Sequence, residues 1–308
     1  MKKRYHRANG TLRVVFCMLI ILSLSTGCMD DTTPDDAGIQ AQEAEPPPSR
    51  GPSPPGCDFQ EDVPPISASD VSITVIYDNN VYDSTLQPDW GFSCLVKGCE
   101  KTILFDTGTH GSILLKNMEK LQITPEEIDV VILSHVHQDH TGGLETILRR
   151  KSALPVYVLQ SFPFAFKEQA RESGAEVIAV EDPVRICSHV YSTGELGGYI
   201  QEQSLIIRTD RGLVVITGCA HPGIIRIIQE TGDLVQSDLY LVMGGFHLQG
   251  TEQSWLEEII SDFKTLGVQY AGPCHCSGDM ARGLFEAAYG QYYISIGVGK
   301  VINLGALD

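Results

Sequence analysis

The sequence is poor in basic residues, with 22 Lys and Arg against 39 Asp and Glu among 308 positions, for a formal charge of −17. A body of this sign repels phosphate backbones, so non-specific nucleic-acid binding is disfavoured. The chain also lacks an internal repeat of fixed short period, which argues against a repeat architecture. It lacks a glycine-rich loop of the right spacing as well, which argues against a phosphate-binding loop of that type. What it does have is 43% hydrophobic content, enough for one large domain or two small ones without disulfide support.

No long apolar run occupies the amino end. Residues 1–27 carry a net +5, and their apolar stretch, Val14 to Leu24, is too short to span roughly 30 Å of hydrocarbon. This pattern predicts a lipoprotein-type signal peptide over residues 1–27. The segment Ser25-Thr-Gly-Cys28 resembles a bacterial lipoprotein cleavage box with Cys28 as the lipidated residue, although Ser25 stands where leucine is usual. Ordinary secretion and an uncleaved anchor are the alternatives.

Residues 28–70 differ in composition from the rest of the chain. They hold ten acids and one base, and nine of residues 29–70 are proline. Such a segment cannot bury enough apolar surface to fold, so we expect a Pro-rich, acidic, disordered tether; an extension packed on the domain is the alternative. Together with the signal, this predicts an exported protein of the bacterial cell envelope, attached to a membrane through its lipid.

Residues 71–308 alternate β-rich runs with amphipathic segments, which is typical of an α/β domain. A helix is expected over residues 113–121, another starting at the capping sequence Thr124-Pro-Glu-Glu, and a third over residues 251–267 with Trp255 and Phe263 facing inward. The expected strands cover residues 71–77, 91–96, 102–105, 128–133, 156–159, 176–180, 238–243 and the hairpin 204–217.

A histidine cluster follows the apolar run 128–133. It comprises His135, His137, Asp139 and His140, and imidazole nitrogens with carboxylate oxygens are the usual ligands of zinc and similar divalent metals. In an extended loop His135 and His137 point to the same side, while Asp139 and His140 enter a turn and can address a second metal. Solvated or core histidines are the alternative reading. One metal needs three or four protein ligands, so others must come from elsewhere in the chain.

The cluster, with the upstream Asp106-Thr-Gly, resembles the signature of the metallo-β-lactamase superfamily. That resemblance implies an αββα sandwich of two mixed sheets flanked by helices. Within the superfamily, the motifs around residues 218–223, 244–248 and 274–278 look most like the branch named for 7,8-dihydropterin-6-methyl-4-(β-D-ribofuranosyl)aminobenzene-5′-phosphate synthase.

The resemblance also implies a site made of two metal ions. His135, His137 and His221 would hold one ion, and Asp139, His140 and His275 the other. Asp106 would orient ligand imidazoles, and His247 would contact the substrate. The chain departs from the pattern where other members have a bridging aspartate, because here the step reads Gly218-Cys219. Cys219 and Glu195 therefore remain candidate ligands, whereas His6, His110 and His189 are not expected to be ligands.

The cysteines give a separate expectation. Without Cys17 and Cys28 the chain keeps seven, an odd number, so at least one should be free or metal-bound in an oxidising compartment.

These features predict a metallohydrolase that uses a metal-activated hydroxide, with Asp106 and Asp139 in the catalytic machinery, on an ester, phosphoester or similar small-molecule substrate. Two divalent ions are expected, zinc first, with manganese or iron also compatible. A transferase of the synthase branch and a non-catalytic metal-binding lipoprotein are the alternative functions.

Overall fold

The computed structural model describes residues 64–307, which all fall within one compact unit, Pro52–Asp308. The predicted signal peptide, the lipidation site Cys28 and most of the predicted tether lie outside the described residues. Among the residues that are described, no helix combines the length and the apolar character needed to cross a membrane.

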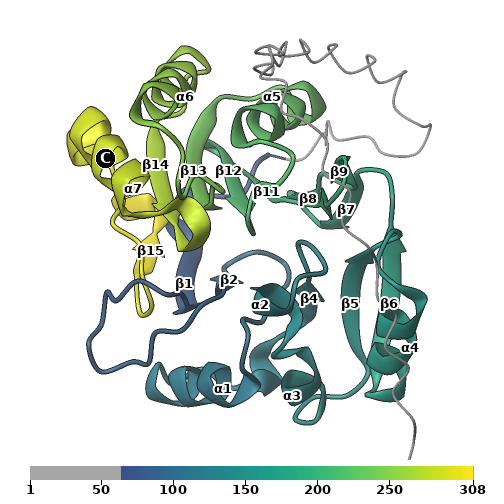
Figure 1. The fold of residues 1–308 in the computed structure, drawn as a ribbon. Coiled ribbons are helices and arrows are strands. Elements are labelled where there is room, and N and C mark those ends of the chain that lie inside the picture. The colour runs from purple at the N-terminus through teal and green to yellow at the C-terminus, as the bar shows by residue number, and fades with distance from the viewer. Residues whose placement is uncertain (1–63, 308) are drawn as a thin grey trace, which may run out of the picture. The chain divides into compact units, whose positions relative to one another are not determined.

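A seven-stranded mixed sheet forms one half of this unit (Figure 1), in the order β15-β1-β2-β3-β4-β5-β6. The strands β3 to β6 run parallel to one another, whereas β15, β1, β2 and β3 pair antiparallel. The bounds are β1 Ser72–Tyr77, β2 Ser93–Lys97, β3 Ile103–Phe105, β4 Val130–Ile132, β5 Leu154–Leu159, β6 Ala175–Val180 and β15 Val301–Asn303.

A six-stranded sheet forms the other half, in the order β14-β13-β12-β11-β8-β7. Here β12, β13 and β14 are parallel, and β11 joins them through the predicted hairpin. The bounds are β7 Val184–Cys187, β8 Val190–Ser192, β11 Leu205–Thr209, β12 Gly212–Thr217, β13 Leu239–Gly245 and β14 Tyr270–Cys274. A small ribbon pairs β9 Leu196–Gly197 with β10 Gln201–Glu202.

Helices cover the outer face of each sheet, which gives four layers. One apolar cluster unites residues of both sheets, such as Phe105 and Ile216, while two others pack helices α1, α3 and α4 on the first sheet and α5, α6 and α7 on the second. The helices are α1 Gly111–Lys120, α2 Gln138–Thr141, α3 Leu144–Leu148, α4 Phe164–Glu172, α5 Ile224–Val235, α6 Gln253–Thr265 and α7 Asp279–Tyr289; the 3₁₀ turns are η1 Ala68–Asp70, η2 Pro125–Glu127, η3 His275–Ser277, η4 Gly290–Tyr292 and η5 Leu304–Ala306. The predicted αββα sandwich of two mixed sheets is confirmed.

Apolar runs explain why the central strands lie where they do. All residues of β4 and β12 are buried, because each strand has a second sheet on one side and helices on the other. The parallel strands β3 and β4 of one sheet, and β12, β13 and β14 of the other, end in polar loops. Because carboxyl ends of parallel strands share an edge, these loops can converge on one site.

The folded unit starts earlier than residue 71. Ile66 bridges Thr209, and the backbone N–H of Ala68 donates to Asp210 Oδ1 at 2.8 Å. Ala68 is itself buried. The last residues assigned to the tether are therefore part of the packed domain, since they cover the apolar edge beside β11.

Two further local expectations were wrong. The capping sequence at Thr124 does form a capping box, but the helix it opens is only the 3₁₀ turn η2. Trp255 is 66% exposed on α6, whose buried face is formed by Leu256, Ile260 and Phe263. A one-residue rotation of the apolar face explains the second error, because Leu256 fits the helical period of Ile260 and Phe263 better than Trp255 does.

Candidate metal centre

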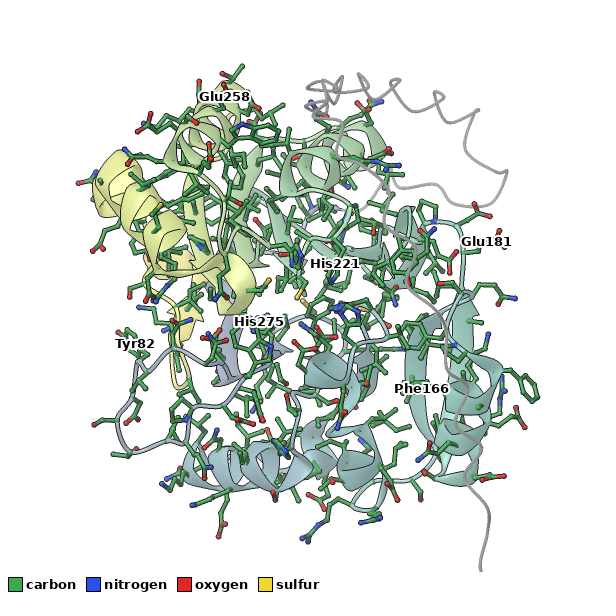
Figure 2. All side chains as sticks on the ribbon, in the orientation of Figure 1. Tyr82, Phe166, Glu181, His221, Glu258 and His275 are labelled. Atoms are coloured by element: carbon green, nitrogen blue, oxygen red, sulfur yellow. The ribbon has the colours of Figure 1, made fainter. Side chains whose placement is uncertain are left out.

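The predicted site residues come from strand-end loops of both sheets. Asp106 follows β3, the cluster from His135 to His140 follows β4, and His221, His247 and His275 follow β12, β13 and β14. In Figure 2, His221 and His275 lie at the edge of the second sheet that faces α2 and β4. The structure thus brings together site residues that lie as far apart in the sequence as Asp106 and His275.

Three imidazoles make up what we call the histidine group: His135, His137 and His221. Their ligand-capable nitrogens all lie within 4.8 Å of one another. The ring centroids of His135 are 4.7 Å from His137 and 4.8 Å from His221. Three convergent nitrogens are the ligand set that catalytic zinc sites use when a further position stays open.

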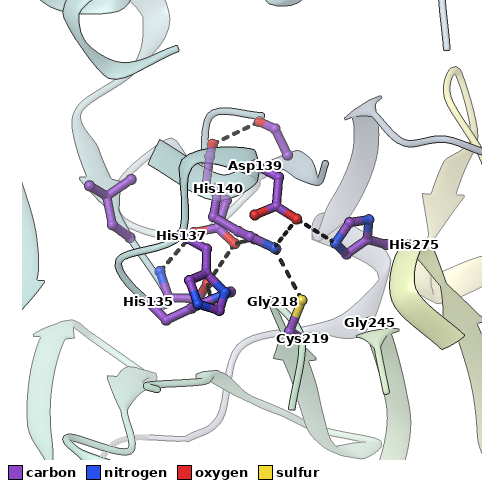
Figure 3. A network of polar contacts seen from close by, with 12 residues as sticks. His135, His137, Asp139, His140, Gly218, Cys219, Gly245 and His275 are labelled. Carbon is purple, nitrogen blue, oxygen red and sulfur yellow. Dashed lines mark hydrogen bonds and ion pairs between the residues drawn. The ribbon is translucent and has the colours of Figure 1, made fainter. Parts of the chain in front are cut away.

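Beside it lies the mixed group, formed by Asp139, His140, Cys219 and His275, whose ligand atoms again lie within 4.8 Å of one another. Cys219 Sγ is 3.2 Å from His140 Nε2, and Asp139 Oδ2 is 3.3 Å from His275 Nε2 (Figure 3). A carboxylate, two imidazoles and a sulfur complete a four-ligand set.

One buried carboxylate orients an imidazole in each group. Asp106 Oδ2 accepts hydrogen bonds from His140 Nδ1 and from Ser134 Oγ, both at 2.7 Å. Because Ser134 donates its only proton to Asp106, its oxygen accepts from His135 Nδ1, at 2.9 Å. Both Nδ1 atoms therefore carry protons, so Nε2 is the ring nitrogen of His135 and of His140 that faces the centre.

His275 is oriented in the same way by Asn79. The Asn79 side-chain oxygen lies 2.9 Å from His275 Nδ1, and the amide nitrogen of Asn79 donates to the His275 carbonyl. The Nε2 atoms of His275 and His221 are buried without a hydrogen-bond partner. Buried polar atoms without partners are costly, and these two inward nitrogens, with the outer nitrogen of His275 held by Asn79, fit bound divalent cations.

Glu202, a residue that the sequence analysis missed, holds the loop that supplies Cys219 and His221. It is 1% exposed, and its Oε1 accepts the backbone N–H groups of Gly218, Cys219 and Ala220 at 2.8 to 3.0 Å. Its Oε2 accepts the N–H of His221 at 2.9 Å. No motif marks Glu202 in the sequence; only its complete burial, which sequence does not show, reveals the role.

The neighbouring Gln203 ties the same segment to the loop after β4. Its backbone N–H donates to the Ser134 carbonyl at 2.9 Å, and its side-chain amide donates to the Leu133 carbonyl at 2.8 Å. The two adjacent residues 202 and 203 therefore fix the loops of both sheets against each other.

The site loops also adopt uncommon backbone conformations. Asp106, Ala220, His247 and His275 all have positive φ, between 48° and 60°. Non-glycine residues in this region cost of order 1–3 kcal/mol each and tend to cluster at functional sites. The fold therefore accepts local strain to aim these side chains.

The two groups differ in their electrostatics. Burial, together with the other imidazoles, lowers the pKa of His135 well below its usual value, and burial with His247 and His137 nearby lowers the pKa of His221 to about 4. Burial opposes the charged form of His140 as well, but the charge and hydrogen bond of Asp106 outweigh it and raise the pKa of His140 to about 9. Burial likewise opposes ionisation of Asp139, yet the contacts with His275 and His140 lower its pKa.

The remaining candidate ligands differ in whether they lie in one of the two groups. Cys219 lies in the mixed group, whereas Glu195 accepts the backbone N–H of Ser161 and does not belong to either group. His247 is exposed at the rim, with its ring 4.4 Å from that of His221. His110 is bonded to Asp89 away from both groups.

Comparison with known proteins agrees with this fold. Residues 88–225 match the model of the metallo-β-lactamase superfamily. The matched segment carries Asp106, the cluster from His135 to His140 and His221, so over these residues the chain is similar to that superfamily.

One curated protein and two solved structures are similar to the chain over 75% of its length. Over 279 residues the chain is 28% identical to the 7,8-dihydropterin-6-methyl-4-(β-D-ribofuranosyl)-aminobenzene-5′-phosphate synthase of Methanocaldococcus jannaschii, covering 75% of this chain and 95% of that protein. A solved structure described as a metal-dependent hydrolase of the β-lactamase superfamily is 26% identical with a TM-score of 0.64, covering 75% and 98%. YhfI of Bacillus subtilis, at 15% identity and a TM-score of 0.56, covers 75% and 99% and shares the fold.

Proposed function

We propose that this protein is a metal-dependent hydrolase that cleaves an ester, phosphoester or similar bond in a small molecule. The observation that carries the proposal is the pairing of the histidine group with the mixed group at one sheet edge. Two divalent cations, zinc first and manganese or iron as alternatives, suit these nitrogen, oxygen and sulfur donors.

Divalent cations held by these two groups would supply a water of lowered pKa and a Lewis acid that polarises a substrate oxygen. His135, His137 and His221 would hold one cation, and Asp139, His140, His275 and Cys219 the other. Asp106 keeps a proton on Nδ1 of His140 and, through Ser134, on Nδ1 of His135. The lone pairs that bind metal thus stay directed inward.

His247 is the residue best placed to meet the substrate. It is exposed beside His221, and Cys276 raises its pKa through a hydrogen bond, against the opposing effect of burial. An imidazole N–H at this place can donate a hydrogen bond to an anionic or carbonyl oxygen of the substrate.

A transferase of the synthase type is the second candidate. The alignment with the Methanocaldococcus jannaschii synthase, which spans 95% of that protein, favours it. This candidate predicts product from a pterin pyrophosphate and an aminobenzene ribotide, with no turnover of simple esters.

The test compares metal content and hydrolysis in His137→Ala and in His110→Ala, a control that also removes an imidazole but lies outside both groups. We expect the parent and the control to bind two equivalents and to hydrolyse ester or phosphodiester probes. His137→Ala should lose one equivalent and on the order of 10³-fold in rate, since the cations supply several kcal/mol of stabilisation. Full metal content and full hydrolysis in His137→Ala would end the proposal, and one closed equivalent without turnover would favour a binding lipoprotein.

We also propose that the protein is exported and anchored in the cell envelope through a lipid on Cys28. The basic start, the short apolar stretch and the cleavage box support this. Cys28→Ser should move the protein from the membrane fraction to the soluble fraction, and unchanged membrane association would contradict the anchor.

A further inference from the structure

Two cysteines from different strand-end loops meet beside the mixed group. Cys219 follows β12 and Cys276 lies in η3 after β14, and their sulfurs lie within 4.8 Å of each other and of a His247 ring nitrogen. Cys276 Sγ donates to the Cys219 carbonyl at 3.6 Å and accepts the backbone N–H of His247 at 3.3 Å. Both thiols are free.

The surroundings of this pair differ from those of the structural cysteines. Cys94 and Cys274 are completely buried within the apolar cluster between the sheets. Cys219 and Cys276 are 4% and 5% exposed, belong to none of the three apolar clusters of the described residues, and lie under the exposed His247. Packing of small apolar groups, the usual reason for a buried cysteine, does not account for their position.

A glycine permits the approach of the two side chains. A Cβ at Gly245 would lie 2.7 Å from Cys276 Sγ and 3.2 Å from Cys219 Cα. Any larger residue on β13 would push the two cysteines apart. The close approach is therefore built into the strand between them.

We propose that Cys219 and Cys276 are a reversible redox pair that a small disulfide or peroxide oxidises to an intramolecular disulfide. With a disulfide oxidant, the sulfur of one cysteine attacks the small disulfide, forms a mixed disulfide and releases one small thiol. The second cysteine then attacks the mixed disulfide and releases the second small thiol, so the two hydrogens leave on these two thiols. With hydrogen peroxide, one cysteine is oxidised to a sulfenic acid with release of water, and the second cysteine displaces the sulfenic hydroxyl as a second water. A disulfide needs sulfurs about 2.05 Å apart, so both side chains must rotate toward each other.

The consequence of oxidation rests on the proposed metal centre. Cys219 Sγ now lies 3.2 Å from His140 Nε2. Rotation toward Cys276 withdraws the sulfur from the mixed group, which then keeps a carboxylate and two imidazoles. Oxidation would thus weaken one metal site and leave the histidine group intact.

The test treats the full chain, freed of metal with a chelator, with oxidised glutathione, alkylates the remaining thiols and maps the tryptic peptides. Cys219 falls in residues 212–226, and Cys276 in residues 265–282 together with Cys274. We expect these two peptides to be joined, with loss of two hydrogens, and to separate after reduction. Cys276→Ser should abolish the link and Cys274→Ser should keep it.

Recovery of alkylated Cys219 and Cys276 after prolonged oxidation, or a lasting glutathione adduct in place of the link, overturns the redox pair. A parallel metal titration follows the consequence: the oxidised protein should bind its second equivalent at least tenfold more weakly than the reduced protein does, with at least a tenfold loss of turnover that reduction restores. If the link forms but reduced protein binds no metal, the metal centre fails while the redox pair stands. If reduced protein binds two metals and no link forms, only the redox pair fails.

Discussion

The histidine group and the mixed group lie side by side, yet their chemistry differs. The histidine group offers three imidazole nitrogens, and two of its members, His135 and His221, have lowered pKa values. The mixed group includes an anionic carboxylate, a sulfur and His140, whose pKa is raised to about 9. Metal binding to His135 and His221 therefore needs little proton release at neutral pH, whereas metal binding to His140 must displace a proton.

Two single variants, each lacking one ligand of one group, should show the difference between the two groups most strongly. His221→Ala should leave a metal only in the mixed group, and His275→Ala only in the histidine group, each with about 10²- to 10⁴-fold slower hydrolysis. The retained ions should differ, because sulfur favours softer metals: His221→Ala should prefer cadmium or zinc over manganese more strongly. Metal analysis after competition checks this, and identical preferences would remove the distinction between the groups.

Glu202→Gln should impair both groups at once. The amide nitrogen would place a donor against one of the backbone N–H groups that Glu202 now accepts, so the loop carrying Cys219 and His221 would shift. We expect affinity for both metals to fall roughly 10- to 100-fold, as for other residues that position ligands.

The matched control for this change is Glu195→Gln, whose carboxylate accepts the backbone N–H of Ser161 and belongs to neither metal group. Metal affinity and thermal unfolding are measured together. A loss of stability with unchanged metal affinity would show that Glu202 supports the fold rather than the metal ligands.

The pH dependence should differ as well. At the mixed group, His140 is protonated below about pH 9, so apparent metal affinity should rise about tenfold per pH unit for each proton displaced, up to that pH. At the histidine group, His221 is already neutral well above about pH 4, so its deprotonation adds no pH dependence between pH 6 and 8. Metal titration of the two single-group variants measures both slopes; equal slopes would contradict the assigned pKa contrast.

Residue patterns predicted the α/β class, the hairpin of β11 and β12 and the buried strand β4, whereas the layered sandwich followed from the family resemblance. Predictions from residue patterns were wrong where packing decides the orientation or the length of a helix. Trp255 and Leu256 are both apolar, and only contact with Ile260 and Phe263 decides which of them faces the core. The sequence predicted the capping box at Thr124 but not the length of the helix after it, because the chain enters β4 soon after the 3₁₀ turn.

The sequence by itself determined the kinds of donor present and their position at strand ends, because apolar runs define the strands and the polar loops must follow them. Only the tertiary structure decided how the donors divide into two groups, that Cys219 joins one of them and Glu195 does not, and that Glu202 holds their loop. These outcomes depend on hydrogen bonds between residues far apart in the chain, such as Asp106 with His140 and Glu202 with Cys219. Local propensity carries no information about such contacts, since they form only when the two sheets pack together.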